Sequence, residues 1–260
     1  MKLSAIDVGE GPPAVLLHGQ PGSAGDWSPV TTRLRGRMRV IVPDRPGYGR
    51  TGGRAAGFRD NATAVVELLD RLGVESAVVA GHSWGTGVAL AVAIHFPERV
   101  RALVLAAPVA PGVPLGFVDR ALAHPLVGPA AARLGLWLAG LGLAVPPVRR
   151  LASASVPALP PDQVAATAAE WRADGVWKSF YVEQRALLTE LPSLAPALSS
   201  LDKPAAVLYG TRDRISPPGH ARRLAGVMPR ARLVLADGAS HMLPQQRPDL
   251  VAGEIARAAR

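Results

Sequence analysis

The sequence predicts an α/β fold in which a mostly parallel central sheet is flanked by helices and carries an inserted block of helices. Two patterns predict this. Short apolar runs alternate with helical patterns in the first and last parts of the chain, as expected for strands joined by crossover helices. From about residue 112 to residue 198 the alternation gives way to helical patterns alone. The length of 260 residues suits one such domain.

The strands are expected where short apolar runs end in loops rich in Gly, Pro, Asp or Ser. These runs cover residues 14–17, 39–42, 77–80, 100–106, 205–209 and 232–235. Helices are expected between them, over about residues 26–34, 60–72, 86–95, 218–227 and 248–258. Because both faces of a parallel sheet are covered by helices, runs that are apolar throughout fit its strands.

The middle of the chain is expected to form a helical cap. Residues 112–198 contain Ala-, Leu- and Pro-rich helical patterns and most of the tryptophans, including Trp137 and Trp177. We therefore expect an α/β core formed by residues 1–111 and 199–260, with the cap formed by residues 112–198.

The composition narrows the classes of partner. Hydrophobic residues make up 48% of the chain and charged residues 19%, as in an ordinary globular protein. The net charge is +9, but the basic residues are scattered singly or in pairs, with no basic stripe interleaved with aromatics, so no nucleic-acid partner is expected. The lack of Cys excludes disulfides and thiolate metal sites.

No segment predicts export or a membrane span. The uncharged stretches 102–118 and 134–148 are shorter than the roughly 20 residues that a spanning helix needs, and both contain Pro and Gly. The first residues lack the apolar core of a signal peptide. We expect a cytoplasmic protein that acts on a small molecule, as a monomer or a homodimer.

The most informative motif is the pentapeptide Gly81-His82-Ser83-Trp84-Gly85. It matches the G-x-S-x-G pattern and lies between a predicted buried strand and a predicted helix, which is the context that a nucleophile elbow requires. A tight turn there lifts the serine hydroxyl above the sheet, and glycines are needed where the turn crowds the backbone. Ser83 is therefore the candidate nucleophile.

Two further residues complete a candidate triad. Asp213 follows the predicted strand 205–209, and at the carboxyl end of a parallel strand its carboxylate can reach the active-site edge of the sheet. His241 follows the predicted strand 232–235 through a short loop, which leaves its imidazole free to approach Ser83. His241 would act as the base, and Asp213 would accept a hydrogen bond from its Nδ1 and stabilise the imidazolium.

In these motifs the chain resembles the α/β-hydrolase-fold serine hydrolases that carry a helical cap. The resemblance rests on the order nucleophile, acid, histidine and on these segments: residues 18–22 (HGQPG), 44–49 (DRPGYG), 81–85 (GHSWG), 210–213 (GTRD) and 240–241 (SH). It implies an oxyanion hole formed by the backbone N–H groups of Gln20 and Trp84, and since Pro21 cannot donate, Gln20 is the member that the first loop supplies. It also implies that His18 supports the loop geometry.

The nucleophile selects the reaction. Haloalkane dehalogenases and epoxide hydrolases are similar to this chain in the first loop, but they use Asp at the elbow, where this chain has Ser83. A serine attacks acyl carbons, so the resemblance implies hydrolysis of an ester, lactone, thioester or amide through an acyl-enzyme. No metal and no cofactor are expected. The substrate is expected to be small and apolar, with contacts from Trp84, Trp137, Trp177 and Met242, although these apolar residues equally suit the core of the cap itself.

Other activities remain open on the same triad. A prolyl aminopeptidase shares the Ser-Trp-Gly elbow, and it would need cap carboxylates to hold the substrate amine, for which Asp162, Glu170, Asp174 and Glu183 are available. A C–C bond hydrolase typically has Trp after the histidine, where this chain has Met242, and a perhydrolase typically has a different residue beside the nucleophile. The alternative that is not an enzyme is a ligand-binding receptor with the hydrolase fold.

Overall fold

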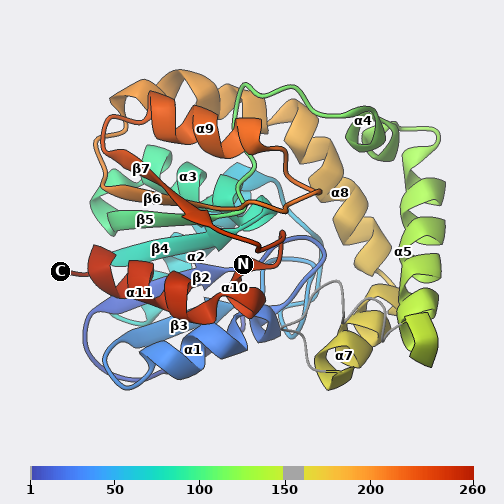
Figure 1. Ribbon diagram of the computed structural model, residues 1–260, viewed down its shortest axis with the longest axis horizontal. Helices are drawn as coiled ribbons and strands as arrows, with labels where there is room; N and C mark the ends of the chain where they lie inside the picture. Colours follow the sequence, from blue (N-terminus) through green and yellow to red (C-terminus); the bar gives the residue numbers. More distant parts are fainter. Residues whose placement is uncertain (1, 149–160) are drawn as a thin grey trace.

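The computed structural model describes residues 2–148 and 161–260, with only the backbone described at 161–163. A seven-stranded sheet runs in the order β1-β3-β2-β4-β5-β6-β7 (Figure 1). Every pair is parallel except β1 with β3. The strands are β1 Ala5–Val8, β2 Pro13–Leu17, β3 Arg39–Pro43, β4 Ala77–His82, β5 Val100–Ala106, β6 Ala205–Gly210 and β7 Ala231–Ala236.

Helices cover both faces of the sheet, because the strands are apolar on both faces. One face packs against α2 (Phe58–Arg71), α3 (Trp84–His95), α9 (Pro218–Val227) and the 3₁₀ segment η3 (Leu191–Ser200). The other packs against η1 (Ala24–Trp27), α1 (Ser28–Leu34) and α11 (Pro248–Ala258). This arrangement is the α/β architecture with a mostly parallel sheet that the sequence predicts.

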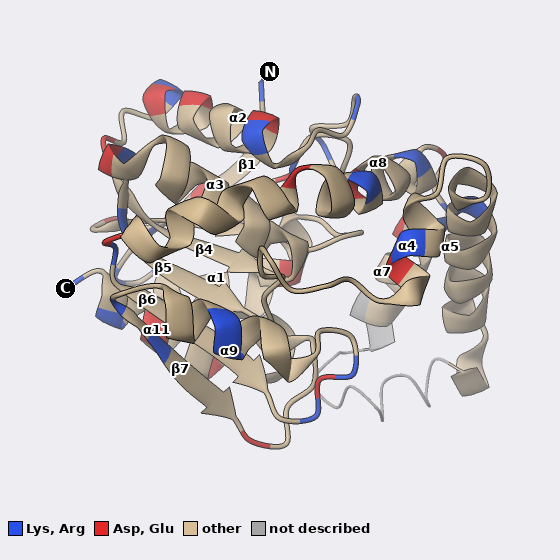
Figure 2. Ribbon diagram, turned by 90° about the horizontal axis from the view of Figure 1, so that it is seen from above, with Lys and Arg blue, Asp and Glu red and all other residues tan. Residues whose placement is uncertain are grey.

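The described residues between β5 and β6 include a helical insertion with α4 (Phe117–Ala123), α5 (Gly128–Ala144), α7 (Pro161–Arg172) and α8 (Val176–Thr189). Figure 1 shows α5, α7 and α8 together on one side of the sheet. Figure 2 shows that α5 is almost without charged residues. Among the described residues no single helix is long and apolar enough to cross a membrane; α4 and α5 meet that criterion only as a pair bent by 112°.

The predicted elements agree with the structure except at one edge. Strand β5 and helices α9 and α11 have the bounds that the sequence predicts, and the other predicted elements differ by at most a few residues at their ends. The edge strand β1, which pairs antiparallel with β3, and the short helix α10 (Leu243–Gln246) are not predicted by the sequence patterns.

Candidate active site

Ser83 occupies a strained turn between β4 and α3. Its φ of 51° and ψ of −121° lie in a region that a residue with a side chain rarely adopts, at a cost of about 1–3 kcal/mol. The flanking glycines are required by close packing. A Cβ on Gly81 would stand 2.4 Å from the carbonyl oxygen of Gly85, and a Cβ on Gly85 would stand 2.4 Å from that of Leu17. The turn therefore has the geometry of a nucleophile elbow.

Thr86 fixes the carbonyl side of this turn. Its hydroxyl donates to the Ser83 carbonyl oxygen at 2.6 Å and accepts a hydrogen bond from the Val109 N–H at 3.1 Å. The Ser83 N–H donates to the Ala106 carbonyl oxygen at 2.9 Å, which extends the pairing of β4 with β5 by one bond. The backbone of Ser83 is thus held from both sides while its side chain stays partly exposed.

Asp213 and His241 meet at the carboxyl edge of the sheet. Asp213 lies after β6, His241 lies after β7, and 2.9 Å separates the Asp213 Oδ2 from the His241 Nδ1. The other carboxylate oxygen accepts N–H bonds from Ile215 at 2.8 Å and from Ser216 at 2.9 Å. Burial by itself would raise the pKa of Asp213, but the hydrogen bonds to His241 and to these N–H groups more than offset it, so the pKa is lowered. The carboxylate is therefore ionised at neutral pH.

His82 holds the loop that carries His241, a role that the sequence does not reveal. Its Nε2 lies 2.9 Å from the His241 carbonyl oxygen, so this nitrogen donates, and the two imidazole rings are 5.1 Å apart. Burial and the nearby His241 lower the pKa of His82 to about 3, so its ring is neutral. Because His82 directly precedes Ser83, this bond ties the elbow to the histidine loop. In the described structure no hydrogen bond joins the Ser83 hydroxyl to the His241 ring.

The loop after β2 lies against the nucleophile. A Cβ on Gly19 would stand 3.2 Å from the Ser83 Cβ and 3.2 Å from the His82 Nδ1, so only glycine fits without displacing a neighbour. His18 is fully buried, accepts the Arg45 N–H at its Nε2 (3.0 Å) and lies 2.8 Å from the Gly19 carbonyl oxygen at its Nδ1. The Gln20 side chain donates to the Oε1 of Gln184 on α8 at 2.8 Å.

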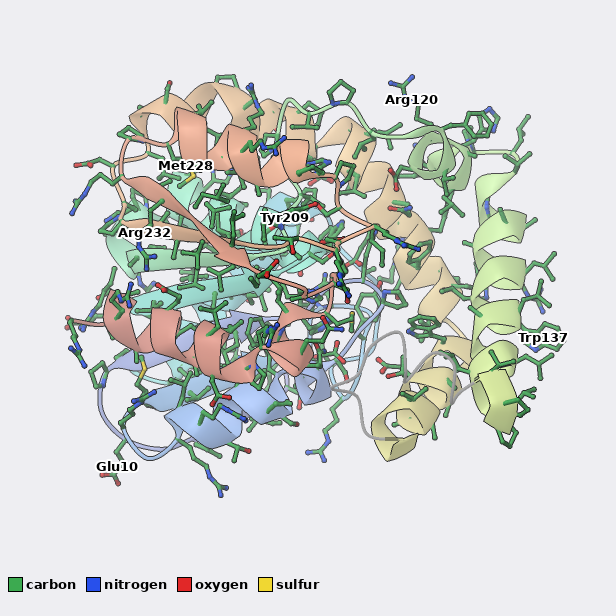
Figure 3. All side chains as sticks on the ribbon, viewed as in Figure 1. Glu10, Arg120, Trp137, Tyr209, Met228 and Arg232 are labelled. Atoms are coloured by element: carbon green, nitrogen blue, oxygen red, sulfur yellow. The ribbon has the colours of Figure 1, made fainter. Side chains whose placement is uncertain are left out.

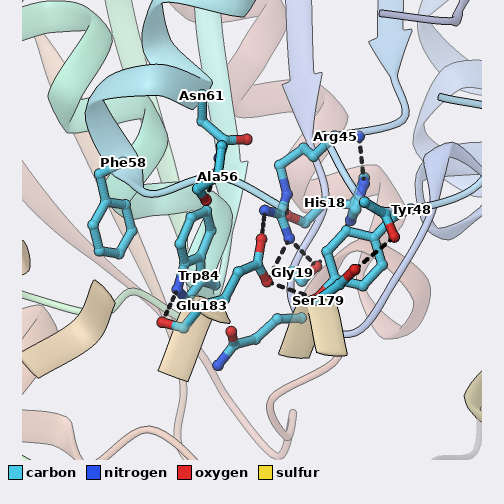
Figure 4. Close-up of polar contacts among 12 residues, drawn as sticks. His18, Gly19, Arg45, Tyr48, Ala56, Phe58, Asn61, Trp84, Ser179 and Glu183 are labelled. Atoms are coloured by element: carbon cyan, nitrogen blue, oxygen red, sulfur yellow. Dashed lines mark hydrogen bonds and ion pairs between the residues drawn. The ribbon is translucent and has the colours of Figure 1, made fainter. Parts of the chain in front are cut away.

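A buried ion pair joins the loop after β3 to the helical insertion, and the same arginine contacts the loop after β2 (Figure 4). The Arg45 and Glu183 side chains are both fully buried and form a salt bridge in which the guanidinium contacts both carboxylate oxygens. Arg45 also donates to the carbonyl oxygens of His18 at 3.0 Å and Gly19 at 2.7 Å, while the Tyr48 hydroxyl donates to Glu183 at 2.8 Å. Glu183 is therefore occupied within the protein and is not a free carboxylate of a cap.

A cavity of about 430 Å³ lies near the Asp213–His241 pair, although Ser83, Asp213 and His241 are not among its described lining residues. It lies between η1 and α1 on one side and α5, α7 and α10 on the other. Two of its lining residues, Ile215 and Met242, are direct neighbours of the pair: the Ile215 N–H bonds to Asp213, and Met242 follows His241. The other lining residues are Ser23, Gly25, Asp26, Ser28, Leu143, Val164, Ala166, Thr167, Glu170, Trp171 and Gln245.

Of the four side chains expected to contact substrate, Met242 alone lines this cavity. The Trp84 indole is fully buried, stacks on Phe58 with 4.1 Å between ring centres, and donates to the Glu183 carbonyl oxygen at 3.2 Å. Trp137 is 49% exposed on the outer side of α5 (Figure 3). Trp177 is partly buried against a small cluster with Tyr48 and Val176. The substrate contacts expected of Trp84 and Trp137 are therefore not found at this cavity. The Trp84 indole packs in the interior, and Trp137 lies at the surface.

The four carboxylates considered as amine ligands of an aminopeptidase have different surroundings in the structure. Glu170 lines the cavity, Asp174 is exposed to solvent, and Glu183 is neutralised by Arg45. The side chain of Asp162 lies outside the described residues.

The chain belongs to the α/β hydrolase family, because the family model matches residues 14–254. It is 27% identical to haloalkane dehalogenase 2 of Mycobacterium tuberculosis over 98% of this chain and 90% of that protein. It is also 41% identical to 2-hydroxymuconate semialdehyde hydrolase of Pseudomonas putida, over 42% of this chain and 41% of that protein.

Solved structures share the fold along the whole chain. A thermophilic esterase from Thermogutta terrifontis has a TM-score of 0.73 and 24% identity, covering 98% of this chain and 92% of its own. The enol-lactonase from Burkholderia xenovorans LB400 has a TM-score of 0.78 and 22% identity, and the match covers 98% of this chain and 95% of the enol-lactonase chain. Together with the family match, these likenesses make the protein a hydrolase of the α/β fold.

Proposed function

We propose that this hydrolase cleaves a small, apolar carboxylic ester or a related acyl substrate through Ser83, His241 and Asp213. The observation that carries the proposal is the hydrogen bond between Asp213 and His241, at the sheet edge where Ser83 projects from its strained turn. The serine at the elbow favours attack on an acyl carbon. Two of the solved structures that share the fold are named an esterase and an enol-lactonase, and esters and lactones are acyl compounds.

In the proposed mechanism the Ser83 hydroxyl attacks the acyl carbon while the His241 Nε2 accepts its proton. Asp213 keeps the Nδ1–H of His241 oriented and stabilises the imidazolium. The tetrahedral intermediate collapses when His241 returns the proton to the leaving alcohol, which leaves an acyl-Ser83 ester. A water molecule, deprotonated by His241, then attacks this ester, and the acid is released as Ser83 recovers its proton.

The negative oxygen of each intermediate would be bound by the backbone N–H groups of Gln20 and Trp84. Trp84 is the first residue of α3, so its N–H is one of the N-terminal donors that lack a partner within the helix, and the helix dipole adds to its effect. Gln20 belongs to the loop that lies against Ser83. We assign the helical insertion the role of a cap that closes the acyl pocket above these groups.

The experiment that tests the proposal is turnover on a panel of 4-nitrophenyl esters from acetate to decanoate, a lactone and a prolyl 4-nitroanilide. We expect hydrolysis of esters, labelling by a fluorophosphonate probe at Ser83 alone, and loss of labelling in Ser83→Ala, because the probe reacts only with an activated serine. Mass spectrometry of the labelled peptide locates the site. Labelling of a serine other than Ser83 would overturn the assignment of the nucleophile. If the protein hydrolyses no member of the panel, the result would favour the interpretation that it is a ligand-binding receptor.

A further inference from the structure

The cavity that Ile215 and Met242 line contains buried acceptors that receive no hydrogen bond from the described residues. The Gln245 side chain is only 4% exposed, and its Oε1 has no hydrogen-bond partner among the described residues. The Oε1 of Glu170 is also buried, and no described residue donates to it. Leaving a buried acceptor unpaired costs about 1–3 kcal/mol, so the two atoms favour hydrogen-bond donors in this cavity, which water or a ligand supplies.

The charges around the cavity are negative. Asp26 and Glu170 line it, and no Lys, Arg or His is among its described lining residues. Arg45, whose charge acts on Asp26, is already paired with Glu183, and Asp44 accepts hydrogen bonds from the N–H groups of Ala24 and Arg50. A positively charged donor would therefore meet two carboxylates that no described lining residue neutralises.

The pKa values of the two lining acids reflect this environment. Burial, with a smaller contribution from Asp26 and Asp44, raises the pKa of Glu170 to about 7, although the Ser23 hydroxyl partly offsets the rise. Burial raises the pKa of Asp26 to about 6, and the Ser23 N–H and Arg45 limit that rise. Within the described part of the chain, neither carboxylate forms an ion pair that would return its pKa to the usual range.

We infer that this cavity holds the protonated amino group of the substrate, with Glu170 and Asp26 as its counter-charges and Gln245 as a further acceptor. The inference rests on the proposed function and narrows its substrate to amine-bearing esters. Leu143 and Val164 would pack on the alkyl part that links the amine to the ester, and Trp171, whose indole N–H donates to no described residue, gives the cavity an aromatic wall.

The inference is tested with pairs of esters in which –NH₃⁺ replaces a terminal methyl group. 4-Nitrophenyl 6-aminohexanoate is compared with the heptanoate, and 5-aminopentyl acetate with hexyl acetate, so that the amine lies in the acyl part or in the alcohol. A hydrogen bond to a charged group contributes about 1.5–3 kcal/mol, so we expect kcat/KM to favour the amine by at least about tenfold in one pair. Equal rates or a preference for the methyl compound in both pairs would refute the inference.

Variants connect the preference to the cavity. Glu170→Gln is expected to lower the amine-to-methyl ratio of kcat/KM by about tenfold. Asp174→Asn makes the same change of charge close by on the exposed surface, and it should leave the ratio as in the wild type. Equal ratios in the wild type and Glu170→Gln would show that Glu170 does not bind the amine. Circular dichroism establishes that each variant is folded.

Binding without turnover separates this inference from the proposed function. We expect hexylammonium to raise the melting temperature of the wild type but not of Glu170→Gln, and hexan-1-ol to have a smaller effect. If no ester is hydrolysed but hexylammonium binds in this way, the proposed function fails and the amine site stands. If esters are hydrolysed without preference and hexylammonium has no effect, the amine site fails and the proposed function stands.

The burial of Glu170 in this cavity also predicts a pH dependence of stability. The unfolded chain releases the Glu170 proton near the usual pKa of 4.5, whereas the folded protein keeps it until about pH 7. The folded state thus binds more protons in this interval, and its free energy of unfolding falls as the pH rises. We expect the melting temperature to drop between pH 5 and pH 8, and to drop less in Glu170→Gln than in the wild type or Asp174→Asn. Parallel curves for all three would contradict the buried, uncompensated position of Glu170.

Discussion

Replacing Asp213 by asparagine is expected to lower kcat for ester hydrolysis by about 10⁴-fold, with a far smaller change in KM. An amide at this position keeps the shape of the side chain, but it can donate to the His241 Nδ1 and so favours the imidazole tautomer that cannot accept the serine proton. Loss of the acid in this way costs a serine protease about 10⁴ in kcat, or roughly 5 kcal/mol of transition-state stabilisation. Steady-state kinetics on the best ester of the panel measure the effect.

Asp237 provides the matched control. It lies on the loop between β7 and His241, is exposed, and accepts a hydrogen bond from the Thr211 hydroxyl at 3.1 Å. Asp237→Asn should therefore change kcat by less than about tenfold. An essential Asp237 together with a dispensable Asp213 would move the acid to the other residue, while Ser83 and His241 would keep their assignments.

The parts of this molecule that the sequence predicts are those determined by local patterns. Strands such as β5 are apolar on both faces and bounded by turn residues, so their position follows from a short window of sequence. The edge strand β1 is only four residues long, half-exposed and interrupted by Asp7. Its place comes from pairing with β3, which is a tertiary contact that no local pattern contains.

The same distinction applies to the candidate site. Ser83, Asp213 and His241 each follow a strand of a parallel sheet, and because those strands end at one edge, their order in the sequence already predicts their proximity. The directions of tryptophan side chains are not determined in this way. Trp84 lies beside the nucleophile in sequence, yet its indole packs between Phe58 and Arg45, because α3 turns it away from the pocket.

Glu183 is the residue whose role in the structure differs most from what the sequence pattern indicates. In the sequence it is one of several acidic residues of the insertion, and nothing nearby indicates a partner. Its partner Arg45 is 138 residues away, and the pair forms only when α8 packs on the loops after β2 and β3. A charge with a distant partner cannot be distinguished by sequence patterns from a charge that faces solvent or substrate.

Removing the Glu183 carboxylate is expected to destabilise the protein strongly. Glu183→Leu leaves the Arg45 guanidinium fully buried without a counter-charge and deprives the Tyr48 hydroxyl of its acceptor. Breaking a buried pair from one side costs about 3–5 kcal/mol, which is a large part of the stability of an ordinary domain. The free energy of unfolding in urea measures the loss.

An exposed ion pair serves as the control for this variant. Asp249 pairs with Arg33 at 2.5 Å, and their side chains are 84% and 37% exposed. Asp249→Asn should leave the free energy of unfolding close to that of the wild type, because water solvates both groups once the pair is broken. A similar loss of stability in both variants would contradict the buried character of the Arg45–Glu183 pair.

The double variant Arg45→Met, Glu183→Leu separates stability from loop geometry. It buries no unpaired charge, so we expect it to recover part of the stability that Glu183→Leu loses. It also removes the guanidinium that holds the carbonyl oxygens of His18 and Gly19, next to the Gln20 N–H of the proposed oxyanion hole. Since a displacement of about 1 Å can cost 10²-fold in rate, kcat should stay at least about tenfold below the wild type in the double variant even where urea unfolding shows recovery. Recovery of both quantities together would mean that the pair stabilises the fold without positioning this loop.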